Sequence, residues 1–407
     1  MFKLLLFAFL NCILLTNGAT NWAVLVAGSN EYYNFRHQAD ICHAYQIFHE
    51  NNIPDENIIV MMYDDIANNT NNPFPGTIIN KPLGANVYKG VPKDYVGDDV
   101  NPDNFLAVLK GDSSSASGRV LNTTKDDNIF IYFSDHGAVG LVAFPNSYLY
   151  AHQLMDALEY MYNNGKYNHL VFYLEACEAG SMFNNLLNSS MNIYATTAAT
   201  PTESSYACYL DPLFQTYLGD LYSVNWLENS DSFENIWNET LRAQFMMDKV
   251  ETNMSEVCQY GNMNMSRMGL KNFMLFNNAS SHLGQNKLRQ INSKGIAPKD
   301  VINSEDVEID FLMREYVENA DYDRKRTILR NLQQEFTMRT FYDAIFKEDY
   351  DDLKSTNATG CYPNYYIDTY CLQDKIELFE SHFGKFTSYG MKYVRLLAED
   401  CKVSRNY

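Results

Sequence analysis

A histidine and a cysteine follow two apolar runs of the sequence at similar distances. Residues 129–133 (IFIYF) lead to His136 and Gly137, and residues 170–174 (LVFYL) lead to Cys177. If these runs are neighbouring parallel strands, both side chains lie at the carboxyl edge of a sheet, where open α/β sheets place their ligands. A cysteine nucleophile needs a base, a proton donor for the leaving amine and N–H groups that face the oxyanion. The pattern indicates a Cys–His site with Gly137 and Cys177 as N–H donors; the alternative is a buried thiol and a loop histidine that never meet.

Both runs belong to a series of short apolar segments that alternate with helical patterns. The segments are residues 22–28, 58–63, 129–133, 170–174 and 193–198. Between them, residues 37–52 and 152–162 repeat apolar side chains at helical spacing. Strands without polar alternation, separated by helices, require a mostly parallel sheet that is covered on both faces. We therefore predict an α/β domain over residues 20–280.

The sequence changes character after this domain. Residues 281–304 contain Gly284, Gly295 and Pro298 and show little periodicity, which is typical of an exposed linker. From residue 305 to about 347, and again over 373–400, the apolar positions recur at helical spacing. We predict a smaller all-α domain over residues 305–407.

The composition excludes two classes of protein. The chain has 407 residues, 46% of them hydrophobic, so it can bury a full core and is not disordered. Its net charge of −19 argues against a nucleic-acid binder, which needs a dominant basic field. There is no Walker-type glycine-rich loop, and we predict no cofactor. Nothing in the sequence demands more than a monomer.

The first 19 residues predict entry into the secretory pathway. One lysine precedes an apolar run that ends in Gly18-Ala19, as in a cleaved signal peptide, and the run is shorter than the ~20 residues of a membrane anchor. No later segment is long and apolar enough to span a membrane. Eight Asn-x-Ser/Thr sequons are therefore candidate glycosylation sites. They are Asn68, Asn122, Asn188, Asn238, Asn253, Asn264, Asn278 and Asn357.

The cysteine count points to a free thiol. Removing Cys12 with the signal peptide leaves seven cysteines, so at least one stays unpaired or pairs outside the chain. In a secreted protein such a thiol is a candidate nucleophile, although a buried inert cysteine is the commoner case.

Seven ordered blocks within residues 27–228 have a more specific meaning. They are AGSN–YNFRHQAD–CHAYQ at 27–46, MMYDDIA at 61–67, NPFPG at 72–76, IYFSDHG at 131–137, YLEACEAGSMF at 173–183, ESSYACY at 203–209 and YLGDLYSVNWLE at 217–228. Together they resemble the legumain family, asparaginyl endopeptidases that are caspase-like cysteine proteases. The helical tail resembles the inhibitory prodomain of that family more loosely.

The resemblance implies roles for the residues of the Cys–His site. It makes His136 and Cys177 the catalytic dyad, with Asn34 orienting the histidine; otherwise Asn34 is a turn residue. Asp135 matches a residue that can cyclise to a succinimide in this family, a change linked to peptide joining. The activity implied is hydrolysis after Asn through a thioester, with peptide ligation as a side activity.

A pocket that selects Asn can also be reasoned from chemistry. A carboxamide presents an acceptor oxygen and a two-donor nitrogen, so it suits a fixed cation and carboxylates. Family correspondence puts Arg36, Glu175 and Asp220 there, with Ser204 and Ser205 lining the groove. Because an ionised Asp would be repelled by the carboxylates, we expect cleavage after Asp only at acid pH. The alternative for Arg36 or Glu175 is a structural ion pair.

The tail is expected to cap the active site of an acid-activated zymogen. Cleavage after Asn286, Asn292 or Asn303 would release it. Acid would protonate carboxylates and break ion pairs to the basic residues of the tail. Those basic residues are Arg324, Lys325, Arg326, Arg330 and Arg339.

The tail departs from the family in its cysteines. The family usually has four there in two bridges, whereas this tail has Cys361, Cys371 and Cys401. Matching positions suggests a disulfide between Cys361 and Cys401 and leaves Cys371 without its usual partner. Cys258 is an additional cysteine relative to the family, so a disulfide between Cys258 and Cys371 remains an alternative.

Other candidate sites are weaker. Asp64-Asp65 and the acidic run 349–352 have no His or Cys at ligand spacing, so we predict no metal site. His37, His43 and His49 are six residues apart on a predicted helix, which puts them on different faces. We interpret them as structural or surface residues.

Two rival functions remain at this point. The catalytic subunit of the anchor transamidase shares the dyad, but a helical tail stands here in place of a C-terminal membrane span. The second rival is a secreted binding module built on an inactive protease fold. The intact His136, Gly137 and Cys177 argue against it. We therefore expect an endopeptidase of protein substrates, with its own prodomain and cystatin-type proteins as inhibitors. Its expected location is a lysosome, an acidic vacuole or a secreted fluid such as a gut lumen.

Overall fold

The computed structural model describes residues 19–276, 300–356 and 360–404. The predicted signal peptide, the linker candidates Asn286 and Asn292, and the sequons at Asn278 and Asn357 lie outside these ranges. Within them, no helix is both long enough and apolar enough to cross a membrane.

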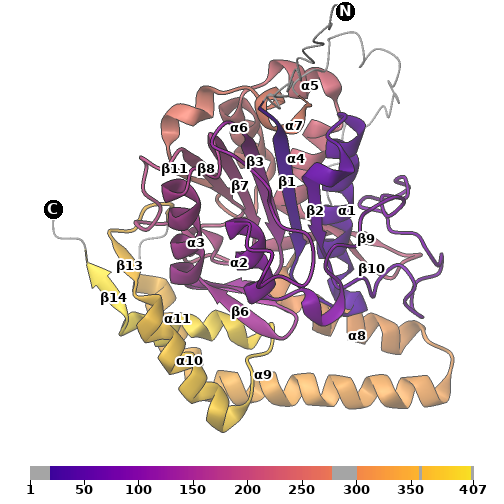
Figure 1. Ribbon diagram of the computed structural model, residues 1–407. Coiled ribbons are helices and arrows are strands. Elements are labelled where there is room, and N and C mark those ends of the chain that lie inside the picture. Colours follow the sequence, from indigo (N-terminus) through magenta and orange to yellow (C-terminus); the bar gives the residue numbers. More distant parts are fainter. Residues whose placement is uncertain (1–18, 277–299, 357–359, 405–407) are drawn as a thin grey trace, which may run out of the picture.

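A six-stranded sheet forms the centre of the molecule (Figure 1). Its spatial order is β11-β8-β7-β3-β1-β2, and only the edge strand β11 runs antiparallel to its neighbour. The strands are β1 (Asn21–Ala27), β2 (Ile58–Met61), β3 (Asn128–Ser134), β7 (His169–Glu175), β8 (Ile193–Thr197) and β11 (Cys258–Gly261). The predicted apolar runs therefore form one mostly parallel sheet, and the expected fold class is confirmed.

Helices cover both faces of this sheet. Alternate strand residues such as Leu25 and Tyr132 face one apolar core, while Val24 and Ile131 face the other. The first core is closed mainly by α1 (Phe35–Glu50), α4 (Leu221–Ser230) and α6 (Leu241–Glu251), together with the short α5 (Phe233–Asn238) and α7 (Lys271–Met274). The second is closed by α2 (Pro102–Lys110) and α3 (Ala151–Asn163). Burial on both faces explains why the strands lack polar alternation.

Two small sheets extend the carboxyl edge of the central sheet. One is the meander β4 (Gly137–Ala138), β5 (Leu141–Phe144) and β6 (Ser147–Tyr150). The other has the order β10-β9-β12, with β9 (Tyr206–Asp211), β10 (Thr216–Asp220) and β12 (Ile302–Asn303). The second sheet joins the two parts of the chain, because β12, at the end of the 281–304 linker, pairs antiparallel with β9.

The tail is helical, as predicted, and lies across the carboxyl edge of the sheet (Figure 1). Its elements are α8 (Val307–Glu318), α9 (Tyr322–Thr356), β13 (Tyr365–Ile367), α10 (Thr369–Phe383), α11 (Val394–Glu399) and β14 (Lys402–Ser404). The periodic stretch expected over 373–400 is two helices, because α10 ends at Gly384 with a φ of 83°.

The tail packs tightly against the β4–β6 meander. Side chains of α9, α10 and α11 share an apolar core with Ala138, Leu141 and Tyr150 of the meander. Gly140 allows the close approach, since a Cβ there would lie 2.7 Å from Thr369 Cγ2. Burial of such a shared core is the main force that holds the tail in place.

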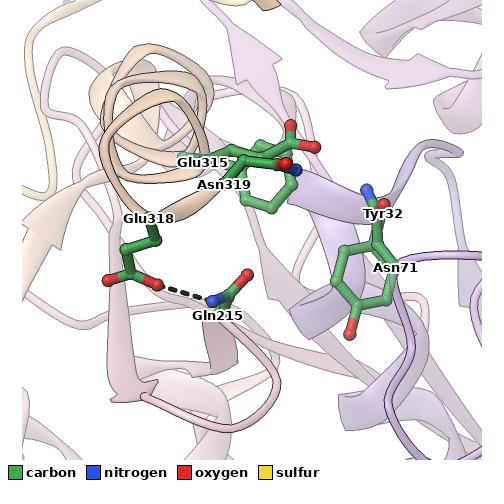
Figure 2. A pocket seen from close by; sticks show the side chains of 7 residues that line it. Tyr32, Asn71, Gln215, Glu315, Glu318 and Asn319 are labelled. Atoms are coloured by element: carbon green, nitrogen blue, oxygen red, sulfur yellow. Dashed lines mark hydrogen bonds between the residues drawn. The ribbon is translucent and has the colours of Figure 1, made fainter. Parts of the chain in front are cut away.

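The contact of α8 with the catalytic part is more polar. A cavity of about 260 Å³ remains there, and Gln215 Nε2 donates to Glu318 at 2.5 Å across it (Figure 2). The cavity is lined by Tyr32, Asn71, Gln215, Phe311, Glu315, Glu318 and Asn319. This end of the tail is therefore less completely packed than the end that covers the meander.

The predicted disulfide between Cys361 and Cys401 is wrong. Cys371 bonds Cys401, and Cys361 bonds Cys258 of β11. The reason is tertiary, since Cys401 and Cys371 stand next to the β13–β14 ribbon, while Cys361 lies against the edge strand of the central sheet. The alternative Cys258–Cys371 bridge is also wrong.

Six predicted glycosylation sites lie in the described residues and are exposed. They are Asn68, Asn122, Asn188, Asn238, Asn253 and Asn264. Their exposure leaves each amide open to modification, and glycosylation stays a prediction.

Candidate active site

The register of β3 and β7 brings the two motif loops together. Ser134, the last residue of β3, pairs with Glu175, the last residue of β7, so both chains leave the sheet side by side. Gly137 then packs on the cysteine loop, because a Cβ there would lie 2.4 Å from the carbonyl oxygen of Cys177. Only a residue without a side chain fits this position.

Asn34 fixes the tautomer of His136. Its Nδ2 donates to the carbonyl of Asn30 at 2.9 Å, which turns Oδ1 toward Nε2 of His136, also at 2.9 Å. Nε2 must then carry the proton, and Nδ1 keeps a lone pair that can accept one. Burial, followed by the charge of Arg36, lowers the pKa of His136 to about 3. The imidazole is therefore neutral in the closed protein.

Cys177 is a buried free thiol. Its Sγ lies 3.3 Å from the backbone nitrogen of Ser205 and 3.6 Å from Oγ of the same residue. Burial, followed by the charges of Glu178 and Glu305, raises its pKa well above the ordinary value. Because Glu305 belongs to the tail, departure of the tail would remove one of the charges that oppose thiolate formation.

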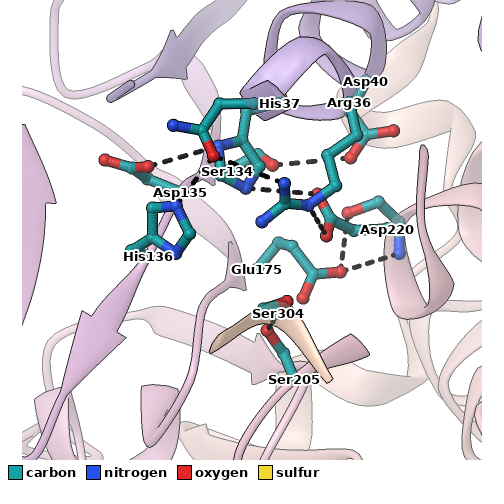
Figure 3. Close-up of polar contacts among 12 residues, drawn as sticks. Arg36, His37, Asp40, Ser134, Asp135, His136, Glu175, Ser205, Asp220 and Ser304 are labelled. Atoms are coloured by element: carbon teal, nitrogen blue, oxygen red, sulfur yellow. Dashed lines mark hydrogen bonds and ion pairs between the residues drawn. The ribbon is translucent and has the colours of Figure 1, made fainter. Parts of the chain in front are cut away.

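In the same region as His136, a buried guanidinium faces carboxylates (Figure 3). Arg36 Nε donates to Asp220 Oδ1 at 2.8 Å, and Glu175 Oε2 accepts from the nitrogen and Oγ of Ser223 at 3.1 and 2.9 Å. Three buried polar atoms of this group have no hydrogen-bond partner. They are Arg36 Nη2, Glu175 Oε1 and Asp220 Oδ2. Burial raises the pKa of both carboxyl groups, and the Arg36 charge opposes the shift.

Five further residues belong to this network and were not predicted as site residues. His37, interpreted as structural or surface, lies edge-on to His136 with ring centroids 5.1 Å apart, and Ser29 Oγ is 2.6 Å from its Nδ1. Asp40 accepts from Ser134 Oγ at 3.4 Å, and Ser223 holds Glu175. His37 and Asp40 follow Arg36 by one residue and one helical turn. Their place at the start of the first predicted helix was the available signal.

His43 and His49 are remote from the thiol, as expected. His43 contacts Asn80 and Asp231, and the exposed His49 contacts Asp55. They hold α1 to neighbouring loops.

The predicted groove residues contact the tail. Ser204 Oγ donates to Glu305 at 2.7 Å, and the carbonyl of Ser205 accepts from the nitrogen of Ser304 at 3.1 Å. In Figure 3, Glu175 lies between the Arg36–Asp220 pair and the contact of Ser205 with Ser304. The tail therefore occupies the groove beside the thiol.

One group of side chains has the composition of a metal site. His37, Asp135 and His136 offer ligand atoms that all lie within 4.8 Å of one another. Each histidine already has a hydrogen-bonded nitrogen, and His37 Nδ1 also lies 3.2 Å from the Asp135 carboxylate. Since hydrogen bonding explains the cluster, we propose no metal there.

The comparisons with known proteins agree with this geometry. The model of the peptidase C13 family matches residues 21–282. This chain belongs to the peptidase C13 family. Legumain of Mus musculus is 49% identical over 322 residues, covering 78% of this chain and 72% of that protein. Legumain of Homo sapiens is 42% identical, and the match covers 95% of this chain and 90% of that protein. The vacuolar-processing enzyme of Citrus sinensis is 40% identical, and the match covers 94% of this chain and 81% of that protein.

The predicted resemblance is thus confirmed, and the chain is a C13 cysteine endopeptidase. Among solved structures, caspase-1 from Spodoptera frugiperda matches with a TM-score of 0.34 and 9% identity, covering 60% of this chain and 88% of that one. This likeness is too low to carry an argument, and the fold rests on the sheet described above.

Proposed function

We propose that this C13 peptidase cleaves peptide bonds after Asn, with Cys177 as nucleophile and His136 as general base and acid. The observation that carries the proposal is a set of buried polar atoms around Arg36 that have no hydrogen-bond partner. Arg36 Nη2 is a free donor for a carboxamide oxygen, and Glu175 Oε1 is a free acceptor for its NH2 group. Asp220 Oδ2 also accepts no hydrogen bond, although it lies 3.6 Å from Nε2 of His37. Buried polar atoms without partners are costly, so a ligand that satisfies all three is strongly preferred.

The reaction follows from the same geometry. Nδ1 of His136 takes the thiol proton as Cys177 attacks the carbonyl carbon, and returns it to the leaving amine. The N–H groups of Gly137 and Cys177 are the proposed oxyanion donors. Water then hydrolyses the thioester, whereas a peptide amine in its place gives ligation. A succinimide at the buried Asp135 remains an optional prediction for the joining reaction.

Peptides that differ only in the residue before the scissile bond test this specificity. With mature enzyme, we expect Ala-Ala-Asn to be turned over across pH 4–7, and Ala-Ala-Asp only toward the acid end. Buried carboxylates repel an ionised Asp, while a protonated Asp has the donor and acceptor pattern of Asn. Fluorogenic turnover measures both.

Ala-Ala-Gln serves as the control, because it carries the same amide on a side chain one methylene longer. Equal turnover of Asn and Asp peptides at pH 7 would contradict the proposed pocket. Turnover of neither, after confirmed removal of the tail, would favour the transamidase or binding-module functions.

We further propose that the tail, residues 305–407, together with the end of the linker that precedes it, inhibits the enzyme by occupying its substrate groove. β12 adds to the edge of β9 as a bound peptide would, with Ile302 opposite Ala207 and Asn303 opposite Tyr206. The next residue, Ser304, is buried and donates its N–H to Ser205, which also contacts the Cys177 thiol. We propose that Ser304 takes the place of the substrate residue whose side chain enters the pocket. Its Oγ lies 3.4 Å from Ser205 Oγ and makes no hydrogen bond with the three unpartnered atoms.

A substitution of Ser304 tests this register. Ser304→Asn is expected to make the full-length chain cut itself after residue 304, because the pocket then receives its preferred carboxamide. Intact mass after acid incubation identifies the cut. Asp306→Asn, which adds the same group outside the β12–β9 pairing, should not be cut there, nor should Ser304→Asn combined with Cys177→Ala. Absence of a cut after residue 304 in an otherwise active protein would overturn the register.

Asn303 is a poor processing site in this arrangement. Its Oδ1 accepts from the nitrogen of Glu305 at 3.0 Å, so its amide is engaged within the tail. We propose that processing starts at another residue, with Asn286 and Asn292 of the linker still the sequence-based candidates.

The basic residues that were expected to lose ion pairs in acid do not hold the tail on the groove. Arg324 pairs with Glu315, and Arg339 pairs with Glu335 and Asp306, all within the tail itself. Lys325 lies over the ring of Tyr316, also in the tail. Protonation of these carboxylates would loosen the tail internally without breaking its hold on the groove.

The carboxyl groups that are buried when the tail is closed favour the closed form, not the open form, as the pH falls. Burial raises the pKa of Glu305, which lies near Lys392. Burial, followed by the charge of Glu335, raises the pKa of Glu308 to about 7. If opening hydrates them, their pKa values return toward about 4.3. The closed form then binds more protons, so it is favoured as the pH falls from about 7. We propose that acid activates the zymogen through cleavage and not through detachment alone.

The proposed setting is an acidic compartment of the secretory pathway, a lysosome or vacuole, in keeping with the relative named vacuolar-processing enzyme. The proposed partners are protein substrates with an accessible Asn and cystatin-type inhibitors. Either would have to enter the groove that β12 fills.

A further inference from the structure

A covalent bond joins the tail to the catalytic part of the chain. Cys258 belongs to β11 of the central sheet, Cys361 follows α9 of the tail, and their sulfurs are bonded over a separation of 103 residues. Both cysteines are buried, with 0% and 9% of their surface exposed.

Hydrogen bonds and an aromatic contact surround this disulfide. Tyr260 Oη donates to the carbonyl of Cys361 at 2.8 Å, and Tyr362 Oη donates to the carbonyl of Gln259 at 2.7 Å. The two tyrosine rings meet edge to face, with centroids 5.7 Å apart. Asn184 Nδ2 donates to the carbonyl of Tyr365 at 2.8 Å. Cys361 and the residues that follow it are thus held against β11 and against Asn184.

The position of the bridge in the sequence has a direct consequence. Asn286, Asn292 and Asn303 all lie between Cys258 and Cys361, as does every residue of the 281–304 linker. A cut at any of them leaves two chains that remain joined through sulfur. The second disulfide, between Cys371 and Cys401, lies wholly within the tail and has no such effect.

We propose that cleavage of the linker yields a disulfide-linked two-chain form that retains the tail, and that the tail leaves only after a small thiol reduces Cys258–Cys361. This inference rests on the proposed zymogen function. A tethered inhibitor faces its groove at an effective concentration in the millimolar range, so it rebinds after each opening. In the reduction, a thiolate attacks one sulfur and forms a mixed disulfide, and a second thiol displaces it. The products are two protein thiols and one oxidised disulfide of the reductant.

The test separates cleavage from release. A recognition sequence for an unrelated protease is inserted between residues 290 and 291 of the full-length protein, so that the cut does not depend on the activity of the enzyme itself. After cutting, we expect one species in non-reducing electrophoresis and size exclusion, and two after treatment with dithiothreitol. The Cys258→Ser/Cys361→Ser variant should give two chains in non-reducing electrophoresis, and Cys371→Ser/Cys401→Ser should behave as the unsubstituted protein does.

Turnover of the Asn peptide gives the second readout. After cutting, and with a reductant too weak to open the bridge, the Cys258→Ser/Cys361→Ser variant should be at least tenfold more active than the protein that keeps the bridge. Separate chains without reductant in the unsubstituted protein would overturn the proposal. A retained tail with full turnover would uphold the bridge but overturn its inhibitory effect. Failure of self-cleavage at acid pH in the protein without the insert would count against the zymogen function and leave the tether result intact.

Discussion

Replacement of Cys177 by alanine is expected to lower turnover of the Asn peptide by about 10⁴-fold or more, because the thioester can no longer form. His136→Ala should have a comparable effect, and the double variant should lose little more, since the two side chains act as a unit. The measurement is kcat/KM of the mature enzyme, with thermal melting to show that each variant is folded.

Cys208→Ala is the matched control. Cys208 is also a free, fully buried thiol of the same part of the chain, but it lies on β9 and packs with Leu221 and Val224. We expect its replacement to change stability slightly and turnover within about twofold. Loss of activity in Cys208→Ala but not in Cys177→Ala would place the nucleophile elsewhere.

Replacement of Glu175 by glutamine is expected to reverse much of the discrimination between Asn and Asp. The change removes the negative charge beside the pocket, so at pH 6 the ratio of Asp to Asn turnover should rise by about 10- to 100-fold. Turnover of the Asn peptide itself should fall by about tenfold, the usual effect of weakening one hydrogen bond to a charged group by ~1.5 kcal/mol.

Ser223→Ala separates this charge effect from a loss of positioning. It removes the hydroxyl that donates to Glu175 Oε2 at 2.9 Å and leaves the carboxylate in place. Asn turnover should decrease, whereas the preference for Asn over Asp at pH 6 should remain. If Glu175→Gln kept the full preference of the unsubstituted enzyme, Asp220 and Arg36 alone would account for specificity.

The sequence predicted the sheet and the edge at which the motifs meet. Apolar runs without alternation identify buried parallel strands, and both motifs follow such runs directly, so local pattern suffices for them. The catalytic roles of His136 and Cys177 and the use of Arg36, Glu175 and Asp220 as a pocket are predictions that the geometry supports.

Other residues of the polar network around His136 and Arg36 were not predicted from the sequence. His37 and Asp40 lie on the first helix, where their closeness to Arg36 is the one local signal, and the packing of α1 against β3 and β10 brings them to the site. A helical pattern gives the face on which a residue lies but not what that face meets.

The sequence by itself determined the apolar strands and the order of the motifs that follow them, because those properties depend on neighbouring residues; the site residues and the division of the chain remain predictions from it. The tertiary structure alone decided that Ser304 fills the groove and that Cys361 bonds Cys258 instead of Cys401. Both contacts join residues about 100 positions apart, and such contacts are set by the packing of the tail across the sheet edge, which no local spacing encodes.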